Sequence, residues 1–224
     1  MDVIAPAAAG DTRLRIDVWV DVACPWCYLG KKRLETAITQ SDAADRVDVV
    51  LHAFELDPGA SRTVEPNLEY LARHLRMPPA RARALEEQMR QLAAQEGLPY
   101  EIDRAHGNSL DVLRLTLLAR TYGLANAFMG VVQERLFSGA ADVYEPEFLV
   151  SAAERVGVPA DEARDVLDGD RFADEVRAEH RAALELGATG VPFTVLDGRY
   201  GIPGAVPVDG YREAIATALG TLGS

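Results

Sequence analysis

The sequence predicts an α/β protein with a large all-helical insertion, and three observations support that prediction. A strand, a helix and a second strand are expected near the N-terminus, a long helical stretch follows, and a hairpin with a closing helix comes last. Because two-stranded pieces are marginally stable alone, the strands before and after the helical stretch are expected to pair in one sheet. We therefore expect a discontinuous core formed by residues 14–66 and 187–222, and an insertion domain formed by residues 67–186.

The first three elements follow from the spacing of apolar residues. Residues 14–22 alternate apolar side chains with polar or aromatic ones, which is typical of a strand with one apolar face. Apolar residues then recur at helical spacing over residues 29–38. Residues 47–54 form a β-branched run that ends in turn residues, which predicts the second strand.

The remaining elements are predicted in the same way. Within the insertion, helical periodicity predicts several helices, at residues 82–93, 110–118, 125–137, 146–156, 160–167 and 171–186. Residues 192–196 then form a short strand, Asp197 and Gly198 a two-residue turn, and residues 199–202 the return strand. Residues 211–222 predict a closing amphipathic helix.

The charge and hydropathy of the chain bear on its partners and its location. The 224 residues include 35 acidic and 23 basic side chains, for a net charge of −12, so a nucleic-acid partner is not expected. No apolar run is long enough for an ordinary membrane span, so no membrane partner is expected either. The first 18 residues lack the features of a secretory signal, and we expect a cytoplasmic protein. The sequence indicates no oligomeric state.

The chain has only two cysteines, and they are three residues apart in the motif Cys24-Pro25-Trp26-Cys27. This spacing is compatible with half of a zinc site or with a redox dithiol. A tetrahedral zinc site needs four ligands, but there is no second cysteine pair and the four histidines are scattered, so no metal is expected. The redox interpretation is therefore favoured.

The position of the motif assigns a role to each cysteine. It lies where the first strand ends and a helix begins, and Pro25 suits the first helical turn because its missing N–H costs nothing there. Unpaired amides and the helix dipole are expected to lower the pKa of Cys24, whose sulfur should be exposed and nucleophilic. Cys27, one turn further in, is the expected resolving thiol. Asp21 is either a proton acceptor for Cys27 through water or a polar residue at the strand end, and Trp26 is expected to contact substrate.

Longer stretches of sequence resemble a known family. The segment CPWCYLG at residues 24–30, the following helical insertion and the segment GVPF at residues 190–193 resemble the DsbA-like thioredoxin-fold oxidoreductases. Within that family they resemble the FrnE branch, first associated with polyketide biosynthesis. The pieces FEL at residues 54–56 and DGRY at residues 197–200 also match. The resemblance implies a thioredoxin-like fold with the helical insertion placed within it.

The same resemblance implies how the site is built. It implies that the Val191–Pro192 peptide is cis and faces the cysteines, with the backbone of Val191 available to an extended substrate. Pro25, Trp26, Val191 and Pro192 are then the substrate-binding residues. It implies no flavin, nucleotide or metal cofactor, since the reactive group is the redox-active disulfide itself. Glutathione is a candidate thiol partner.

The predicted function is that of a protein disulfide oxidoreductase or isomerase acting on protein or small-molecule thiols and disulfides, with Cys24 attacking and Cys27 resolving. One alternative is a glutathione-dependent isomerase or kappa-class transferase, enzymes of the same fold that tend to have serine at the position of Cys24. The other is a chaperone whose activity does not depend on the cysteines. The helical insertion is expected to wall one side of the site.

Overall fold

The computed structural model describes residues 13–42 and 44–222, without the side chains of residues 221 and 222. The first twelve residues, on which the expectation about a secretory signal partly rests, lie outside the described residues. The chain divides into two compact units. The core unit consists of Met1–Leu56 and Asp174–Ser224, and the helical unit consists of Asp57–Ala173.

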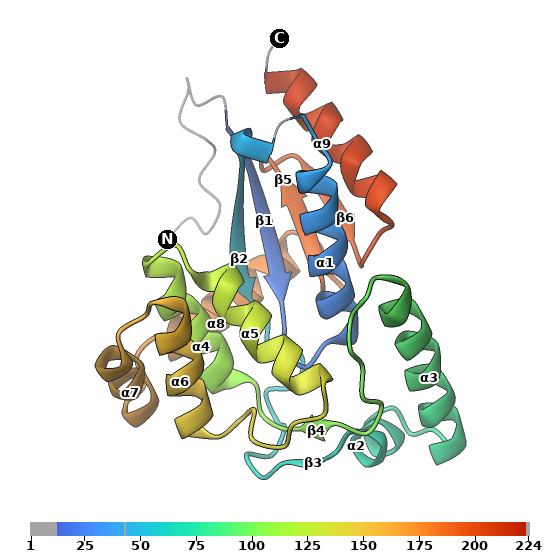
Figure 1. Cartoon of the computed structure of the whole chain (residues 1–224), viewed down its shortest axis with the longest axis vertical. Helices are drawn as coiled ribbons and strands as arrows, with labels where there is room; N and C mark the ends of the chain where they lie inside the picture. The colour runs from blue at the N-terminus through green and yellow to red at the C-terminus, as the bar shows by residue number, and fades with distance from the viewer. Residues whose placement is uncertain (1–12, 43, 223–224) are drawn as a thin grey trace. The chain divides into compact units, whose positions relative to one another are not determined.

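The core unit is built around a four-stranded sheet with the order β2-β1-β5-β6 (Figure 1). Its strands are β1 (Leu14–Val20), β2 (Val47–Ala53), β5 (Phe193–Leu196) and β6 (Tyr200–Pro203). β1 runs parallel to β2 and antiparallel to β5, and β6 returns antiparallel beside β5. The central strand β1 thus pairs with one strand from each segment of the core unit, which confirms the prediction that the strands before and after the helical stretch share one sheet.

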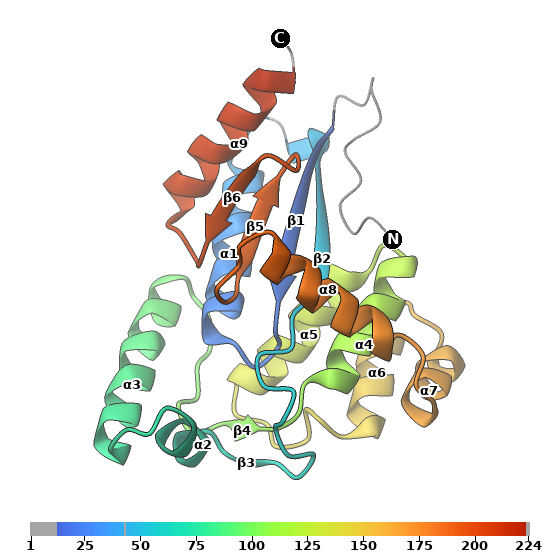
Figure 2. The same cartoon turned by 180° about the vertical axis from the view of Figure 1, so that it is seen from behind.

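Helices cover both faces of this sheet. The core-unit helices are α1 (Pro25–Thr39), α8 (Ala173–Glu185) and α9 (Val208–Leu222), with a short 3-10 turn, η1, at Ala44–Arg46. α1 and α9 pack together on one face, and α8 crosses the other, as Figures 1 and 2 show from opposite sides. Side chains alternate between the two faces along β1, so Ile16 and Val18 lie on the face of α1 and α9, and Asp17 and Trp19 on the face of α8.

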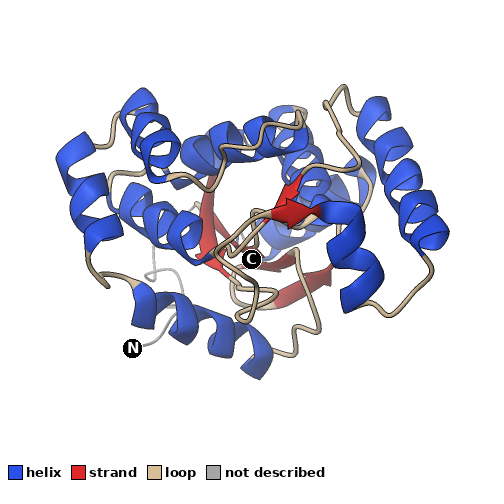
Figure 3. Ribbon diagram, turned by 90° about the horizontal axis from the view of Figure 1, so that it is seen from below, coloured by secondary structure: helices blue, strands red, loops and turns tan. Residues whose placement is uncertain are grey.

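The helical unit is formed by six helices in the described chain. They are α2 (Asn67–His74), α3 (Pro79–Gln95), α4 (Leu110–Thr121), α5 (Ala125–Phe137), α6 (Pro146–Val156) and α7 (Ala160–Asp168). α4, whose sequence is apolar on nearly all sides, is buried on most of them. Two short strands, β3 (Glu65–Pro66) and β4 (Ala105–His106), pair within this unit and were not predicted. Helices make up most of the regular structure (Figure 3).

The observed division of the chain differs from the expected ranges at both boundaries. Residues 57–66 group with the helical unit, and α8 groups almost entirely with the core unit. α8 belongs there because Glu179 is bonded to the central strand β1 and to the neighbouring edge strand β2. Its backbone carbonyl accepts the indole N–H of Trp19 at 3.0 Å, and its carboxylate accepts the N–H of Ala53 at 2.7 Å. Helical periodicity predicted α8 but carried no information about which unit it contacts.

A buried ionic cluster lies between α8 and the sheet. His52 on β2 places Nε2 2.7 Å from Oδ1 of Asp17 and Nδ1 3.2 Å from Oε1 of Glu179. All three side chains are almost completely buried, and the ring of His52 stacks on Trp19 with 4.5 Å between centroids. Arg15, which is partly exposed, donates from Nε to both carboxylate oxygens of Asp17 and from Nη2 to Oδ1. We call this group the Asp17–His52–Glu179 cluster.

The cluster shifts the titration of its own members. Burial alone would lower the pKa of His52, but the hydrogen bonds and negative charges of Asp17 and Glu179 outweigh it and raise that pKa above its ordinary value of 6.5. Burial alone would raise the pKa of Asp17, but hydrogen bonds from His52 and Arg15 outweigh it and lower that pKa below 3.8. Both shifts favour the charged forms, so the cluster behaves as a buried set of paired charges.

Candidate active site

The two cysteines lie at the start of α1. Cys24 is the last extended residue before the helix, with φ −76° and ψ 115°, and Pro25 occupies the first turn. The carbonyl of Cys24 accepts the N–H groups of Cys27 at 3.1 Å and Tyr28 at 3.2 Å. Cys24 therefore stands at the positive end of the helix dipole, where the sequence placed it, and Cys27 lies one turn inside.

Asp21 shapes the turn between β1 and α1. Its backbone carbonyl accepts the N–H of Cys24 at 3.3 Å, and its carboxylate accepts the N–H of Ala23 at 2.9 Å. The other carboxylate oxygen accepts the N–H of Leu56, just beyond β2, at 2.8 Å. The buried carboxylate thus ties the turn of the motif to the end of the neighbouring strand.

The Val191–Pro192 segment faces Cys24, although the two are far apart in sequence. The Cys24 Sγ lies 3.4 Å from the carbonyl oxygen of Val191, to which the thiol donates a hydrogen bond. The Val191–Pro192 peptide is cis, and the carbonyl of Pro192 accepts the N–H of Gly204 at 2.8 Å. Within the described part of the chain, no residue accepts a hydrogen bond from the N–H of Val191. One backbone donor therefore stays available beside Cys24.

Exposure differs sharply within the motif. Both cysteines are free thiols and both are buried, Cys24 with 5% and Cys27 with 1% of its surface exposed. The expectation of an exposed Cys24 was wrong, because the sulfur lies against the backbone of Val191. Trp26 between them is 43% exposed, so its ring is available for contact with another molecule.

The thiol of Cys27 is held in its protonated form. Burial raises the pKa of Cys27 well above its ordinary value of 9.0, and a hydrogen bond with Cys24 and the negative charge of Cys24 raise it further. A backbone hydrogen bond from Asp21 opposes this effect, and the charge of Asp21 adds to it. The second cysteine is thus a poor nucleophile while the first is a free thiol or thiolate.

Sequence reasoning missed one glycine in this region. Gly30, one turn after Cys27, is buried where α1 meets the ring of Pro192 and the turn at Ala205. A glycine inside a predicted helix is unfavourable by roughly 0.5–1 kcal/mol relative to alanine. A glycine retained in a helix despite that cost indicates a position where another segment approaches the backbone closely, and this is the signal that could have identified Gly30.

Lys31 and Lys32 directly follow the CPWCYLG segment on α1. The structure pairs Lys31 with Glu35 one turn further along α1, at 2.6 Å, as expected for a solvated helix face. Arg33 donates instead to the carbonyl of Ala205 at 3.0 Å and ties α1 to the turn before α9.

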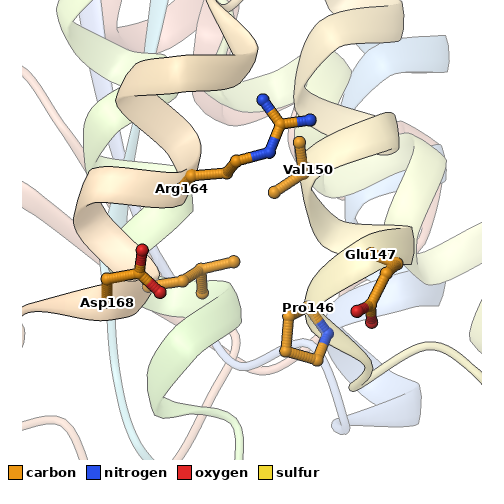
Figure 4. Close-up of a pocket in the computed structure, with 6 residues that line it drawn as sticks. Pro146, Glu147, Val150, Arg164 and Asp168 are labelled. Carbon is orange, nitrogen blue, oxygen red and sulfur yellow. The ribbon is translucent and has the colours of Figure 1, made fainter.

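Other hollows lie in the helical unit and contain none of the predicted site residues. One of about 300 Å³ lies between α6 and α7. Arg164 and Val150 line one end of it, and the carboxylates of Glu147 and Asp168 lie on opposite sides (Figure 4). Among the described residues, no group of three or more histidine, cysteine, aspartate or glutamate side chains is arranged to hold a metal ion. None of the described helices is both long and apolar enough to cross a membrane.

Comparisons with known proteins agree with this geometry. A family model described as a DSBA-like thioredoxin domain matches residues 15–216. A probable DsbA oxidoreductase from Streptomyces coelicolor is 42% identical, with a TM-score of 0.86 over 93% of this chain and 91% of that one. The cytosolic disulfide reductase DsbM from Pseudomonas aeruginosa, solved with GSH, is 20% identical and shares the fold, with a TM-score of 0.65 over 92% of this chain and 98% of that one.

A relative of known sequence is the uncharacterized protein YwbO from Bacillus subtilis, which is 25% identical over 91% of this chain and 96% of its own length. The match to the family model spans both segments of the core unit and the helical unit between them. The protein therefore belongs to the family of DSBA-like thioredoxin domains, the DsbA-like thiol–disulfide oxidoreductases.

Proposed function

We propose that the protein exchanges disulfides with protein or small-molecule thiols, with Cys24 as nucleophile and Cys27 as resolving thiol. The observation that carries the proposal is the placement of Cys24 at the N-terminus of α1, with its Sγ 3.4 Å from the backbone of Val191. Free amides and the dipole at a helix N-terminus stabilise negative charge on a sulfur at that position. Cys27 lies one turn away and can reach the same sulfur.

The proposed reaction proceeds in two exchanges. The Cys24 thiolate attacks one sulfur of a substrate disulfide, forms a mixed disulfide, and expels the other sulfur as a thiolate that takes up a proton. Cys27 then loses its proton and attacks the Sγ of Cys24, which releases the second substrate thiol and leaves a Cys24–Cys27 disulfide. Two electrons pass from the pair to the substrate. The reverse sequence oxidises a substrate dithiol.

The environment of Cys27 orders these two steps. Two of the causes that raise its pKa, the hydrogen bond with Cys24 and the charge of Cys24, depend on a free sulfur at Cys24. Both disappear once the Sγ of Cys24 is part of a mixed disulfide. Cys27 therefore becomes easier to deprotonate only after substrate is attached to Cys24. Formation of the Cys24–Cys27 disulfide is thereby delayed until it can release the substrate thiol.

We propose Asp21 as the group that accepts the Cys27 proton. Its carboxylate is buried, and its charge acts on the Cys27 thiol. It also holds the N–H groups of Ala23 and Leu56, so the same side chain shapes the turn. Asp21→Asn should slow resolution of the mixed disulfide most below neutral pH, while the attack by Cys24 is less affected.

The proposed substrate contacts are Pro25, Trp26, Val191 and Pro192. The free N–H of Val191 can pair with an extended peptide beside Cys24, as a strand pairs with a sheet edge. The exposed ring of Trp26 supplies apolar surface next to the reactive sulfur. Protein thiols and disulfides are therefore the main proposed substrates.

We also propose glutathione as a small thiol partner, a cytoplasmic location, and the FrnE-like branch with its association with polyketide biosynthesis. DsbM, a cytosolic reductase of this fold solved with GSH, supports glutathione as a partner and the cytoplasmic location. The CPWCYLG segment supports the FrnE-like branch. The reactive disulfide itself is the proposed redox group, with no separate cofactor.

Serine variants of the two cysteines test the proposal. The protein should catalyse insulin reduction by dithiothreitol and oxidative refolding of a reduced disulfide protein, and Cys24→Ser should abolish both. Cys27→Ser, the matched variant, should accumulate mixed disulfides, because attack occurs without resolution. In the reduced wild type, mass-mapped iodoacetamide labelling at mildly acidic pH should modify Cys24 well before Cys27. Full exchange activity in Cys24→Ser would refute the proposal.

Blocking both cysteines, by alkylation or by serine substitution, distinguishes the oxidoreductase from the two alternative functions. A glutathione-dependent isomerase would turn over a small aromatic substrate with both cysteines alkylated. A chaperone would suppress aggregation equally well in the double serine variant. Either result, together with absent exchange activity in the wild type, would replace the oxidoreductase as the function.

A further inference from the structure

The backbone of α1 approaches the Val191–Pro192 segment most closely at Gly30. A Cβ atom built on Gly30 would lie 3.0 Å from Cγ of Pro192 and 3.2 Å from Cβ of Ala205. Both distances are shorter than ordinary van der Waals contact between carbon atoms, which begins at about 3.5 Å. A side chain at this position therefore requires the proline ring, the turn or the helix to move.

Little freedom is left for that movement. The carbonyl of Pro192 is held by the N–H of Gly204 at 2.8 Å. The carbonyl of Ala205 is held by Arg33, which lies on α1 itself, at 3.0 Å. The proline ring and Ala205 thus both lie against Gly30, and the turn at Ala205 is itself anchored to α1. The absence of a side chain at Gly30 is what lets the proline ring come this close to α1.

The position of the proline ring determines the position of the backbone beside Cys24. Val191 directly precedes Pro192, and its carbonyl oxygen lies 3.4 Å from the Sγ of Cys24. Gly30 and Cys24 belong to the same rigid helix end. Displacing Pro192 from Gly30 therefore also displaces Val191 from Cys24.

We propose that Gly30 is a positioning residue that sets the distance between Cys24 and the Val191 backbone, and thereby controls the binding of extended peptide substrates. This inference rests on the proposed function, because it assumes that peptide pairs with Val191 while Cys24 attacks its disulfide. A small disulfide without a peptide backbone needs only access to Cys24. Gly30 should therefore matter for peptide substrates and much less for small ones.

A graded pair of substitutions tests this role, with a matched control in another helix. Gly30→Ala adds one methyl group and Gly30→Val adds a branched side chain. Gly220 on α9 is exposed, and a Cβ built on it meets nothing within 4 Å, so Gly220→Ala and Gly220→Val are the controls. Alanine favours a helix over glycine at both positions, so the comparison cancels that effect. Thermal unfolding confirms that each variant folds.

The readout is the kinetics of reduction of two substrates, a disulfide-bonded peptide and 2-hydroxyethyl disulfide. For the peptide, KM should rise about threefold in Gly30→Ala and about tenfold in Gly30→Val, because a displaced Val191 backbone pairs less well with the peptide and a misplacement of about 1 Å can cost about a hundredfold. For 2-hydroxyethyl disulfide, kcat/KM should stay within about twofold of the Gly220 controls. If Gly30→Val does not fold, Gly30→Ala decides the outcome with the same two substrates.

Two results would overturn the positioning role. One is a peptide KM in the Gly30 variants equal to that of the Gly220 controls. The other is an equal loss with both substrates, which would place the effect on the cysteines or on the fold. Failure of the proposed function has a different signature, because exchange activity would then persist in Cys24→Ser or be absent from the wild type, whatever the Gly30 variants do.

Discussion

Along the central strand β1, the face toward α1 and α9 presents Leu14, Ile16 and Val18, whereas the face toward α8 presents Asp17 and Trp19. All five side chains are almost completely buried. On the first face, burial of apolar surface is enough to hold a helix against the sheet, so any helix with a complementary apolar face can pack there. On the second, buried charges are stable only where hydrogen-bonding partners meet them, so α8 must dock at one position.

This difference has a direct effect on the candidate site. α1 carries the cysteines on the apolar face, and α8 leads along the chain to Val191 from the ionic face. The two halves of the site are therefore fixed to the same sheet by different forces. Substitutions that remove one kind of contact at a time can separate their contributions.

The largest effect on stability is expected from Glu179→Ala. The substitution leaves the N–H of Ala53 and Nδ1 of His52 buried without their partner, and removing one member of a buried charged pair costs about 3–5 kcal/mol. Urea denaturation measures the free energy of unfolding. Glu175→Ala, which removes an exposed carboxylate from the same helix, is the control and should cost no more than about 1 kcal/mol. Equal losses in the two variants would mean that α8 is not docked through this carboxylate.

His52→Gln should have a smaller effect, of about 1–3 kcal/mol, that depends on pH. The folded pKa of His52 is raised above 6.5, so its bound proton stabilises the fold fully below about pH 6.5. That stabilisation is lost as the pH rises through the raised pKa. The difference in unfolding free energy between wild type and variant, measured from about pH 5.5 to about pH 9, should therefore shrink as the pH rises. A constant difference would show that His52 acts through packing on Trp19 alone.

Ile16→Val on the opposite face should have the smallest effect. It removes one buried methylene group and should cost about 0.5–1.5 kcal/mol. No charge is involved, so the loss should be the same at every pH in that range. A loss that varied with pH as much as that of His52→Gln would mean that the two faces are energetically coupled.

The contrast between the faces also shows what sequence could predict. Alternation along β1 predicted the strand and its apolar face correctly. It gave no sign that the opposite face is covered, because Asp17 and Arg15 are also typical of a strand facing solvent. Their burial depends on α8, and the bond from Trp19 to Glu179 spans 160 residues. A single strand pattern holds no information on such a distant partner.

The features of the candidate site likewise divide into those that depend on neighbouring residues and those that depend on distant ones. The cysteine spacing and Pro25 predicted the helix start and the order of the two thiols along it, because these depend on local chemistry. The approach of Val191 to Cys24 spans 167 residues and was expected only from the resemblance to a family. The burial of Cys24 was missed for the same reason, since the group that covers it is distant in sequence.

The sheet order has a consequence for the newly made chain. β1 pairs with β2 on one side and with β5 on the other, and the whole helical unit lies between β2 and β5 in sequence. Chains emerge from the ribosome N-terminus first. One edge of β1 therefore keeps its N–H and C=O groups unpaired, next to two free thiols, throughout translation of residues 57–192. A chain that stops before Phe193 never closes that edge, so premature termination leaves a product able to pair with strands of other unfolded chains.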